Sequence, residues 1–188
     1  MTDKATSVAR DRHTGVPVML AQAIVLAAAL ALGELICCPL YVRFAPVFYP
    51  LSWALVAILL AVAFAFVVGF ALLWCAEAFA YRMRRKFQPI VYAVTGAVGF
   101  GVWTWWVVLG IMNMITGRLG LGVVNPTNTV MATAIGAILG MAAFFLAFTL
   151  GERLARHKAA MVAVCVLTVL LAIAGGFILA AMLGSLPA

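Results

Sequence analysis

The chain carries a long apolar run at residues 51–79, LSWALVAILLAVAFAFVVGFALLWCAEAF, whose single charged residue is Glu77. An α-helix rises about 1.5 Å per residue and the hydrocarbon core of a bilayer is roughly 30 Å thick, so about 20 apolar residues cross it. The run is longer than this, and each half of it would be too short to span. It therefore predicts one transmembrane helix that tilts or protrudes from the membrane.

Four further apolar runs of suitable length lie at residues 16–38, 90–115, 130–150 and 159–183. The first of these is too long for the apolar region of a signal peptide. Over the whole chain, 68% of residues are hydrophobic and 9% are charged, whereas soluble domains carry about 25% charged residues. The sequence therefore predicts an all-α bundle of five transmembrane helices. It forms one membrane domain at residues 16–184, which follows an N-terminal segment at residues 1–15.

Ten of the twelve Lys and Arg residues fall in three segments, at residues 1–15, 81–86 and 152–158. Five spans place these three segments on one side of the membrane, and only Arg43 and Arg118 on the other. Short cytoplasmic loops are rich in Lys and Arg, so the N-terminus is predicted in the cytoplasm and the C-terminus outside. We expect a cell membrane, either a bacterial inner membrane or a plasma membrane. The expected partner of the charges is anionic lipid, and no nucleic-acid partner is expected.

Small residues recur at four-residue spacing, which places them on one helix face where backbones approach closely. The fourth span contains Gly136 and Gly140, and the fifth contains Ala172 and Gly176. The connection between these spans is short, so we expect them to pack as an antiparallel hairpin through these four residues. Replacement of Gly136 or Gly176 by Leu is predicted to lower the yield of folded protein.

Glu34 is the main candidate for function, because ionisable residues within spans usually have a role. It lies roughly 10 Å from the centre of the first span, where it could bind a cation, a proton or a substrate amine. Alternatively, it reaches outward and pairs with Arg43. Asn113, Trp103 and Trp106 complete a candidate intramembrane polar site.

Two alternatives stay open for the tryptophans and for the outer connections. Trp103 and Trp106 are expected to share a helix face with Gly110, where they either line a cavity or pack against lipid or a partner. The prolines from Pro39 onward are expected to end the first helix. Asn128 or Thr129 is expected to cap the fourth helix, and residues 116–129 form either an outer loop or a re-entrant turn.

No motif of an enzyme is present. The sequence has no CxxC, HExxH, GxSxG or phosphate-binding glycine loop. His13, His157, Asp3 and Asp11 all lie outside the spans. We therefore predict no catalytic residue, no metal site and no cofactor.

Two functional classes remain. The first is a non-catalytic integral membrane subunit or assembly factor of a larger membrane complex, with other membrane subunits or further copies of the chain as partners. The alternative is a small membrane transport protein or a substrate-binding component of a transporter. The small-residue rows and the short loops favour the first class, and Glu34 with the tryptophans favours the second.

Overall fold

A computed structural model describes residues 18–44 and 48–185, which are helical apart from short connections. Five helices in these ranges are long and apolar enough to cross a membrane. They are α2 (Val18–Phe44), a composite helix over Pro50–Ala80, a second over Arg85–Arg118, α7 (Pro126–Ala155) and α8 (Lys158–Gly184). The predicted all-α fold with five spans is confirmed, and the chain is a multi-pass membrane protein. The predicted N-terminal segment at residues 1–15 lies outside the described ranges.

The second and third spans are each interrupted by a π-helical turn. The second consists of α3 (Pro50–Phe64), the π turn η1 (Ala65–Gly69) and α4 (Phe70–Ala80). The third begins with the 3₁₀ turn η2 (Arg85–Phe87) and continues through α5 (Gln88–Trp103), the π turn η3 (Thr104–Val108) and α6 (Leu109–Arg118). A π turn widens the helix locally and takes up about one extra residue. The two halves of each span therefore follow different sequence registers.

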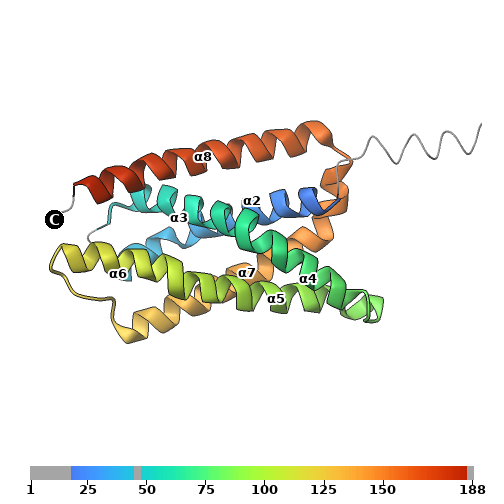
Figure 1. Cartoon of the computed structure of the whole chain (residues 1–188), viewed down its shortest axis with the longest axis horizontal. Helices are drawn as coiled ribbons and strands as arrows, with labels where there is room; N and C mark the ends of the chain where they lie inside the picture. The colour runs from blue at the N-terminus through green and yellow to red at the C-terminus, as the bar shows by residue number, and fades with distance from the viewer. Residues whose placement is uncertain (1–17, 45–47, 186–188) are drawn as a thin grey trace, which may run out of the picture.

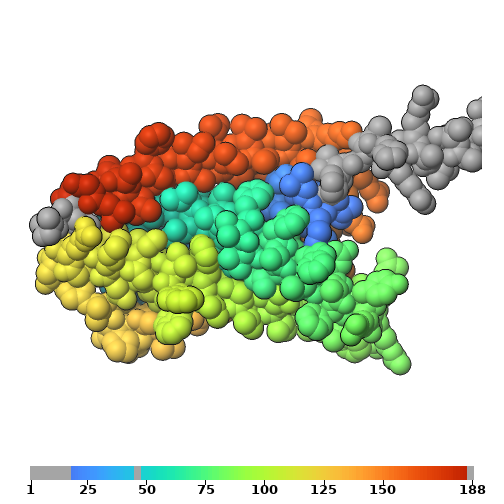
Figure 2. All heavy atoms as spheres, in the orientation of Figure 1, coloured from blue at the N-terminus to red at the C-terminus, as the bar shows by residue number. Residues whose placement is uncertain are grey.

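Helix α2 lies within the bundle, packed against α3, α7 and α8, while α7 also packs along α5 (Figure 1). Helix α8 rests chiefly on α3 and makes few contacts with α7. It forms one edge of the molecule, as the space-filling view shows (Figure 2). Many of its apolar side chains are exposed there, including Val162, Val166, Leu170 and Phe177. In a bilayer, lipid covers such a surface.

Basic residues gather at one end of the bundle. The start of α2, the α4–α5 connection and the α7–α8 connection meet at this end, which we term the basic end (Figure 1). Seven of the nine described Lys and Arg residues lie there: Arg82, Arg84, Arg85, Lys86, Arg153, Arg156 and Lys158. Arg43 and Arg118 lie at the opposite end. The fold thus groups the charges as the sequence predicts, and the cytoplasmic location of the basic end remains a prediction.

The first helix does not end at Pro39, as we expected, but continues through it to Phe44. A proline removes one backbone donor, and transmembrane helices tolerate this because neighbouring groups satisfy the freed carbonyl. Nearby, Cys38 Sγ donates a hydrogen bond of 3.0 Å to the carbonyl oxygen of Pro50 and ties α2 to the start of α3. The longer helix places Tyr41 on the same rigid element as Glu34.

The fourth helix starts earlier than we expected. Asn125 caps it, because its Oδ1 accepts a hydrogen bond of 2.9 Å from the Thr127 amide. Pro126 follows as the first helical residue, where its fixed φ suits the helix and its missing N–H costs little. The predicted caps at Asn128 and Thr129 are therefore wrong. The preceding connection runs across the end of the bundle (Figure 1) and turns through two glycines with positive φ, Gly120 and Gly122.

Gly136 and Gly140 of α7 pack against the third span and not against α8. A Cβ atom on Gly140 would collide with the backbone oxygen of Gly96 and lie 2.6 Å from Phe100 Cβ. A Cβ atom on Gly136 would collide with the side chain of Thr104. The prediction that Gly136 and Gly140 pack against the fifth span is therefore wrong. The fifth span, α8, packs against α3 instead.

The contact of α8 uses Gly175 in place of Gly176. A Cβ atom on Gly175 would collide with the backbone of Leu55 in α3, whereas one on Gly176 would meet nothing within 4 Å. Ala172 is buried, as expected of a packing residue, in a cluster with Ala31 and Ile58. Adjacent residues point about 100° apart around a helix, so only one of the two glycines can face α3.

Aromatic rings fill the centre of the bundle. The ring of Phe64 lies 5.0 Å from that of Phe100, 5.6 Å from that of Trp103 and 6.5 Å from that of Phe144. These residues come from α3, α5 and α7, so the cluster joins three spans. Because lipid is as apolar as these rings, the stabilisation comes from close packing and not from exclusion of water.

Candidate intramembrane polar site

Glu34 is buried within α2, with 1% of its surface exposed. Neither Oε1 nor Oε2 has a hydrogen-bond partner. Arg43 is exposed nine residues further along the same helix, which is about 13 Å along its axis. The alternative in which Glu34 reaches outward and pairs with Arg43 is therefore wrong, because the helix continues through Pro39 and keeps the two residues apart.

Two buried residues share the face of α2 on which Glu34 lies. Cys38 and Tyr41 follow it by four and seven residues, a spacing that stacks side chains along one face. They follow Glu34 by about 6 Å and about 10 Å along the helix axis. The Cys38 thiol is already occupied by the Pro50 carbonyl. The Tyr41 hydroxyl is buried without a partner.

Two indole N–H groups are also buried without partners, at Trp53 in α3 and Trp103 in α5. Trp53 packs against Phe48, with ring centroids 4.6 Å apart, and Trp103 packs against Phe64. Tyr41 and Trp53 belong to one apolar cluster, and Trp103 packs against that cluster. The interior thus holds one carboxyl group and three unused donors at or near one cluster.

Helix contacts place Glu34 at the height of the α5–η3 junction, which contains Trp103. A Cβ atom on Gly33 would lie 2.7 Å from Leu139 Cδ2 in α7. Two residues away on α7, Ala137 lies 3.2 Å from the Cβ position of Gly101 in α5. Glu34 is therefore within roughly one helical turn of this junction along the bundle axis.

The two π turns lie beside the same junction. Phe64 directly precedes η1 and Trp103 directly precedes η3, and their rings pack against each other. Single π turns inside α-helices occur frequently at functional sites. Next to Trp103, the Thr104 hydroxyl donates a hydrogen bond of 2.8 Å to the Phe100 carbonyl, so its proton is not available to a ligand.

The energetics of this arrangement favour a ligand or a proton at Glu34. Each buried polar group without a partner costs about 1–3 kcal/mol, and a lone buried carboxylate costs several kcal/mol. A bound proton or cation neutralises that charge. The phenol and the indoles present both N–H or O–H donors and aromatic faces, and aromatic faces attract cations.

The structure does not bring the other predicted residues into this site. Asn113 Oδ1 accepts a hydrogen bond of 2.9 Å from the Val124 amide and so holds the α6–α7 connection in place. Trp106 is 77% exposed on the outside of the bundle, whereas Trp103 points inward. The two do not share a face, because the π turn η3 begins directly after Trp103 and contains Trp106, and it shifts the helical register between them.

Tyr41 and Trp53 are the residues that sequence reasoning missed. The spacing of seven residues between Glu34 and Tyr41 indicates that the two share a helix face. This indication holds only if the helix continues past Pro39. Trp53 lies near the start of a span, where tryptophan is usually interfacial. Nothing in the sequence indicates that it turns inward.

The described residues offer little other chemistry. No three His, Cys, Asp or Glu side chains in these ranges come together as a metal site. All four cysteines, Cys37, Cys38, Cys75 and Cys165, are free thiols. The chain matches no protein-family model, no curated protein and no solved structure.

Proposed function

We propose that this chain is a small membrane transport protein, or a substrate-binding component of a transporter, that recognises a cationic ligand through Glu34. The observation that carries the proposal is the burial of the Glu34 carboxyl group within a span without a hydrogen-bond partner. A carboxylate without a ligand would more favourably reach the membrane surface or pair with a basic residue. Glu34 does neither.

The surroundings of Glu34 support a small cation or an organic amine as the ligand. Tyr41, Trp53 and Trp103 bring aromatic rings and free donors to the same part of the interior. Ammonium groups bind both to negative charge and to the faces of aromatic rings, so a buried carboxylate with aromatic rings in the same part of the bundle suits them. A proton can occupy the same position on the carboxyl group when no cation is present.

A thermal-shift assay on the purified protein in detergent tests this proposal, with alkali cations and a series of primary and quaternary amines as probes. A ligand present at a hundred times its Kd stabilises the folded state by about 2.7 kcal/mol. For a chain of this size, the unfolding temperature then rises by about 5–10 °C. Glu34→Gln should abolish the response.

Glu77→Gln is the matched control, because Glu77 is an exposed acid at the basic end of α4. It should keep the full response to the ligand. An equal response in Glu34→Gln and in the wild type would contradict the proposal, as would equal losses in both variants.

A membrane subunit or assembly factor is the second candidate. The supporting observation is that Gly110 in α6 and Gly176 in α8 have no neighbour within 4 Å of their Cβ positions, which leaves room for a further helix. Co-purification from the native membrane tests this candidate. A stoichiometric partner that is lost in Gly176→Leu would support it, and purification of the chain alone would count against it.

A further inference from the structure

A groove of about 440 Å³ opens between α7 and α8, with α2 behind it. It exists because α8 rests on α3 and makes few contacts with α7. Ala28 and Ala29 from α2 and Ala160 from α8 line it with small side chains, which leave the space unfilled. The remaining apolar lining consists of Val25, Leu32, Leu146, Leu150, Leu154 and Val164.

The groove combines this apolar wall with basic groups at one end only. Arg153, in the last turn of α7, and His157, in the connection to α8, both line it at the basic end. Both side chains are exposed, and the nearest acid in the sequence is Glu152, which precedes Arg153 in α7. A guanidinium group is always charged and matches the geometry of a phosphate.

The dimensions fit an acyl chain better than a protein helix. The lining residues extend from Val25 to Leu32 on α2 and from Leu146 to Leu154 on α7, which corresponds to roughly 10–12 Å along the bundle axis. A helix about 10 Å wide occupies roughly 900 Å³ over that length, twice the volume of the groove. A flexible hydrocarbon chain can fill a shallower space.

We propose that this groove binds an anionic phospholipid. One acyl chain lies along the alanines of α2 and α8, and the phosphate is held by Arg153 and His157. Basic pockets between transmembrane helices bind acidic lipid headgroups in this way. The site is separate from Glu34, so it stands or falls independently of the proposed transport function.

Lipid binding to the purified full-length protein tests the proposal, measured by native mass spectrometry with phosphatidylglycerol and phosphatidylcholine of identical acyl chains. A basic residue near the membrane surface strengthens binding of acidic lipid by about fivefold. We expect the wild type to bind phosphatidylglycerol at least fivefold more tightly. Arg153→Gln should remove most of that preference.

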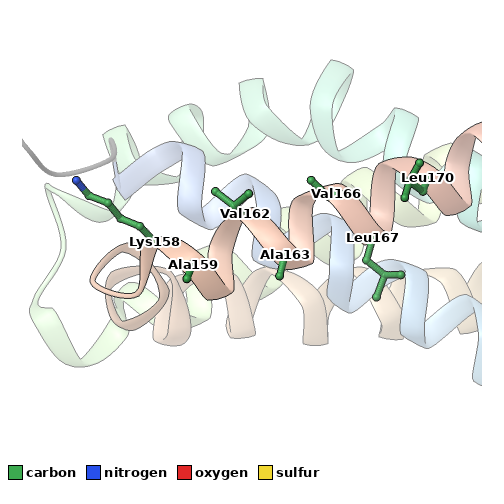
Figure 3. A pocket seen from close by; sticks show the side chains of 7 residues that line it. All are labelled: Lys158, Ala159, Val162, Ala163, Val166, Leu167 and Leu170. Atoms are coloured by element: carbon green, nitrogen blue, oxygen red, sulfur yellow. The ribbon is translucent and has the colours of Figure 1, made fainter.

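Lys158→Gln is the matched charge control. Lys158 is the first residue of α8, directly after His157, and it lies on the outward face of that helix together with Val162, Val166 and Leu170 (Figure 3). It should keep the preference for the acidic lipid. An equal loss in Arg153→Gln and Lys158→Gln would overturn the proposal, because a diffuse charge effect would then account for the result.

A second pair of variants tests the apolar part of the groove. Ala160→Phe places a ring in the groove and should lower binding of both lipids at least threefold. Val162 is exposed about 200° around the helix from Ala160 and points to the other side of α8 from Ala163 (Figure 3), so Val162→Phe should not lower it. Equal binding in the two variants would overturn the proposal. Displacement of phosphatidylglycerol by millimolar inorganic phosphate would also overturn it, since the acyl chain would then contribute nothing.

Discussion

Replacement of Gly140 by Ala is the sharpest test of how the bundle is held together. Gly140 and Gly96 bring the backbones of α7 and α5 into direct contact, and a Cβ atom on Gly140 would collide with the Gly96 backbone. A backbone cannot turn aside as a flexible side chain can, so the two helices must separate locally. Gly176→Ala is the matched control, because nothing lies within 4 Å of its Cβ position.

The expected difference between the two variants follows from two terms. Ala is favoured over Gly in a helix by up to about 1 kcal/mol, and this gain applies to both positions. Overpacking of a close contact costs about 1–3 kcal/mol, and this cost applies to Gly140 alone. Gly140→Ala should therefore be less stable than Gly176→Ala by about 2 kcal/mol. For a chain of this length, that corresponds to about 4–8 °C in the midpoint of thermal unfolding.

Thermal unfolding in one detergent, followed by size-exclusion chromatography of the remaining folded protein, measures this difference. Both variants keep the charge and nearly the whole side-chain composition, so detergent binding should not differ between them. Equal midpoints for Gly140→Ala and Gly176→Ala would refute the close α5–α7 contact.

Three further predictions concern the site, the α6–α7 connection and the orientation. Without a ligand, Glu34→Leu should raise the unfolding midpoint, since it removes an unpartnered buried group that costs about 1–3 kcal/mol; a lower midpoint would contradict this. Asn113→Ala should lose the bond to the Val124 amide, destabilise the chain by about 1 kcal/mol and speed limited proteolysis at residues 119–125; unchanged cleavage would count against it. In intact cells, an impermeant maleimide should label Leu121→Cys and not Met83→Cys, and the reverse pattern would show that the predicted orientation is inverted.

The number and nature of the spans could be predicted from the sequence because length and hydropathy determine them. A run such as residues 51–79 has no other favourable environment than a bilayer. The grouping of basic residues at one end of the bundle followed from the same reasoning. The ends of the spans were less predictable. A proline such as Pro39 or Pro126 can either end a helix or lie within it, and tertiary contacts decide which of the two occurs.

Helix partners could not be predicted from small residues alone. Gly136 and Gly140 form a smooth helix face, and such a face can pack against any helix with a matching surface. In this bundle the matching surface is on α5, at Gly96. The candidate site was predictable only in part for a similar reason. Glu34 is visible as an acid within a span, whereas the inward position of Trp53 and the separation of Trp103 from Trp106 depend on packing and on a π turn.

The π turns also determine where this chain can lose a residue. Elsewhere in a span, deletion of one residue turns everything after it by about 100° and moves buried side chains to the wrong face. Within 65–69 or 104–108, the same deletion removes the extra residue that the wide turn accommodates, and the flanking helices keep their facing. A scan of single-residue deletions should therefore find two short tolerant windows in the middle of the second and third spans. Such windows would allow related chains to differ in length at the core of the bundle rather than in its loops.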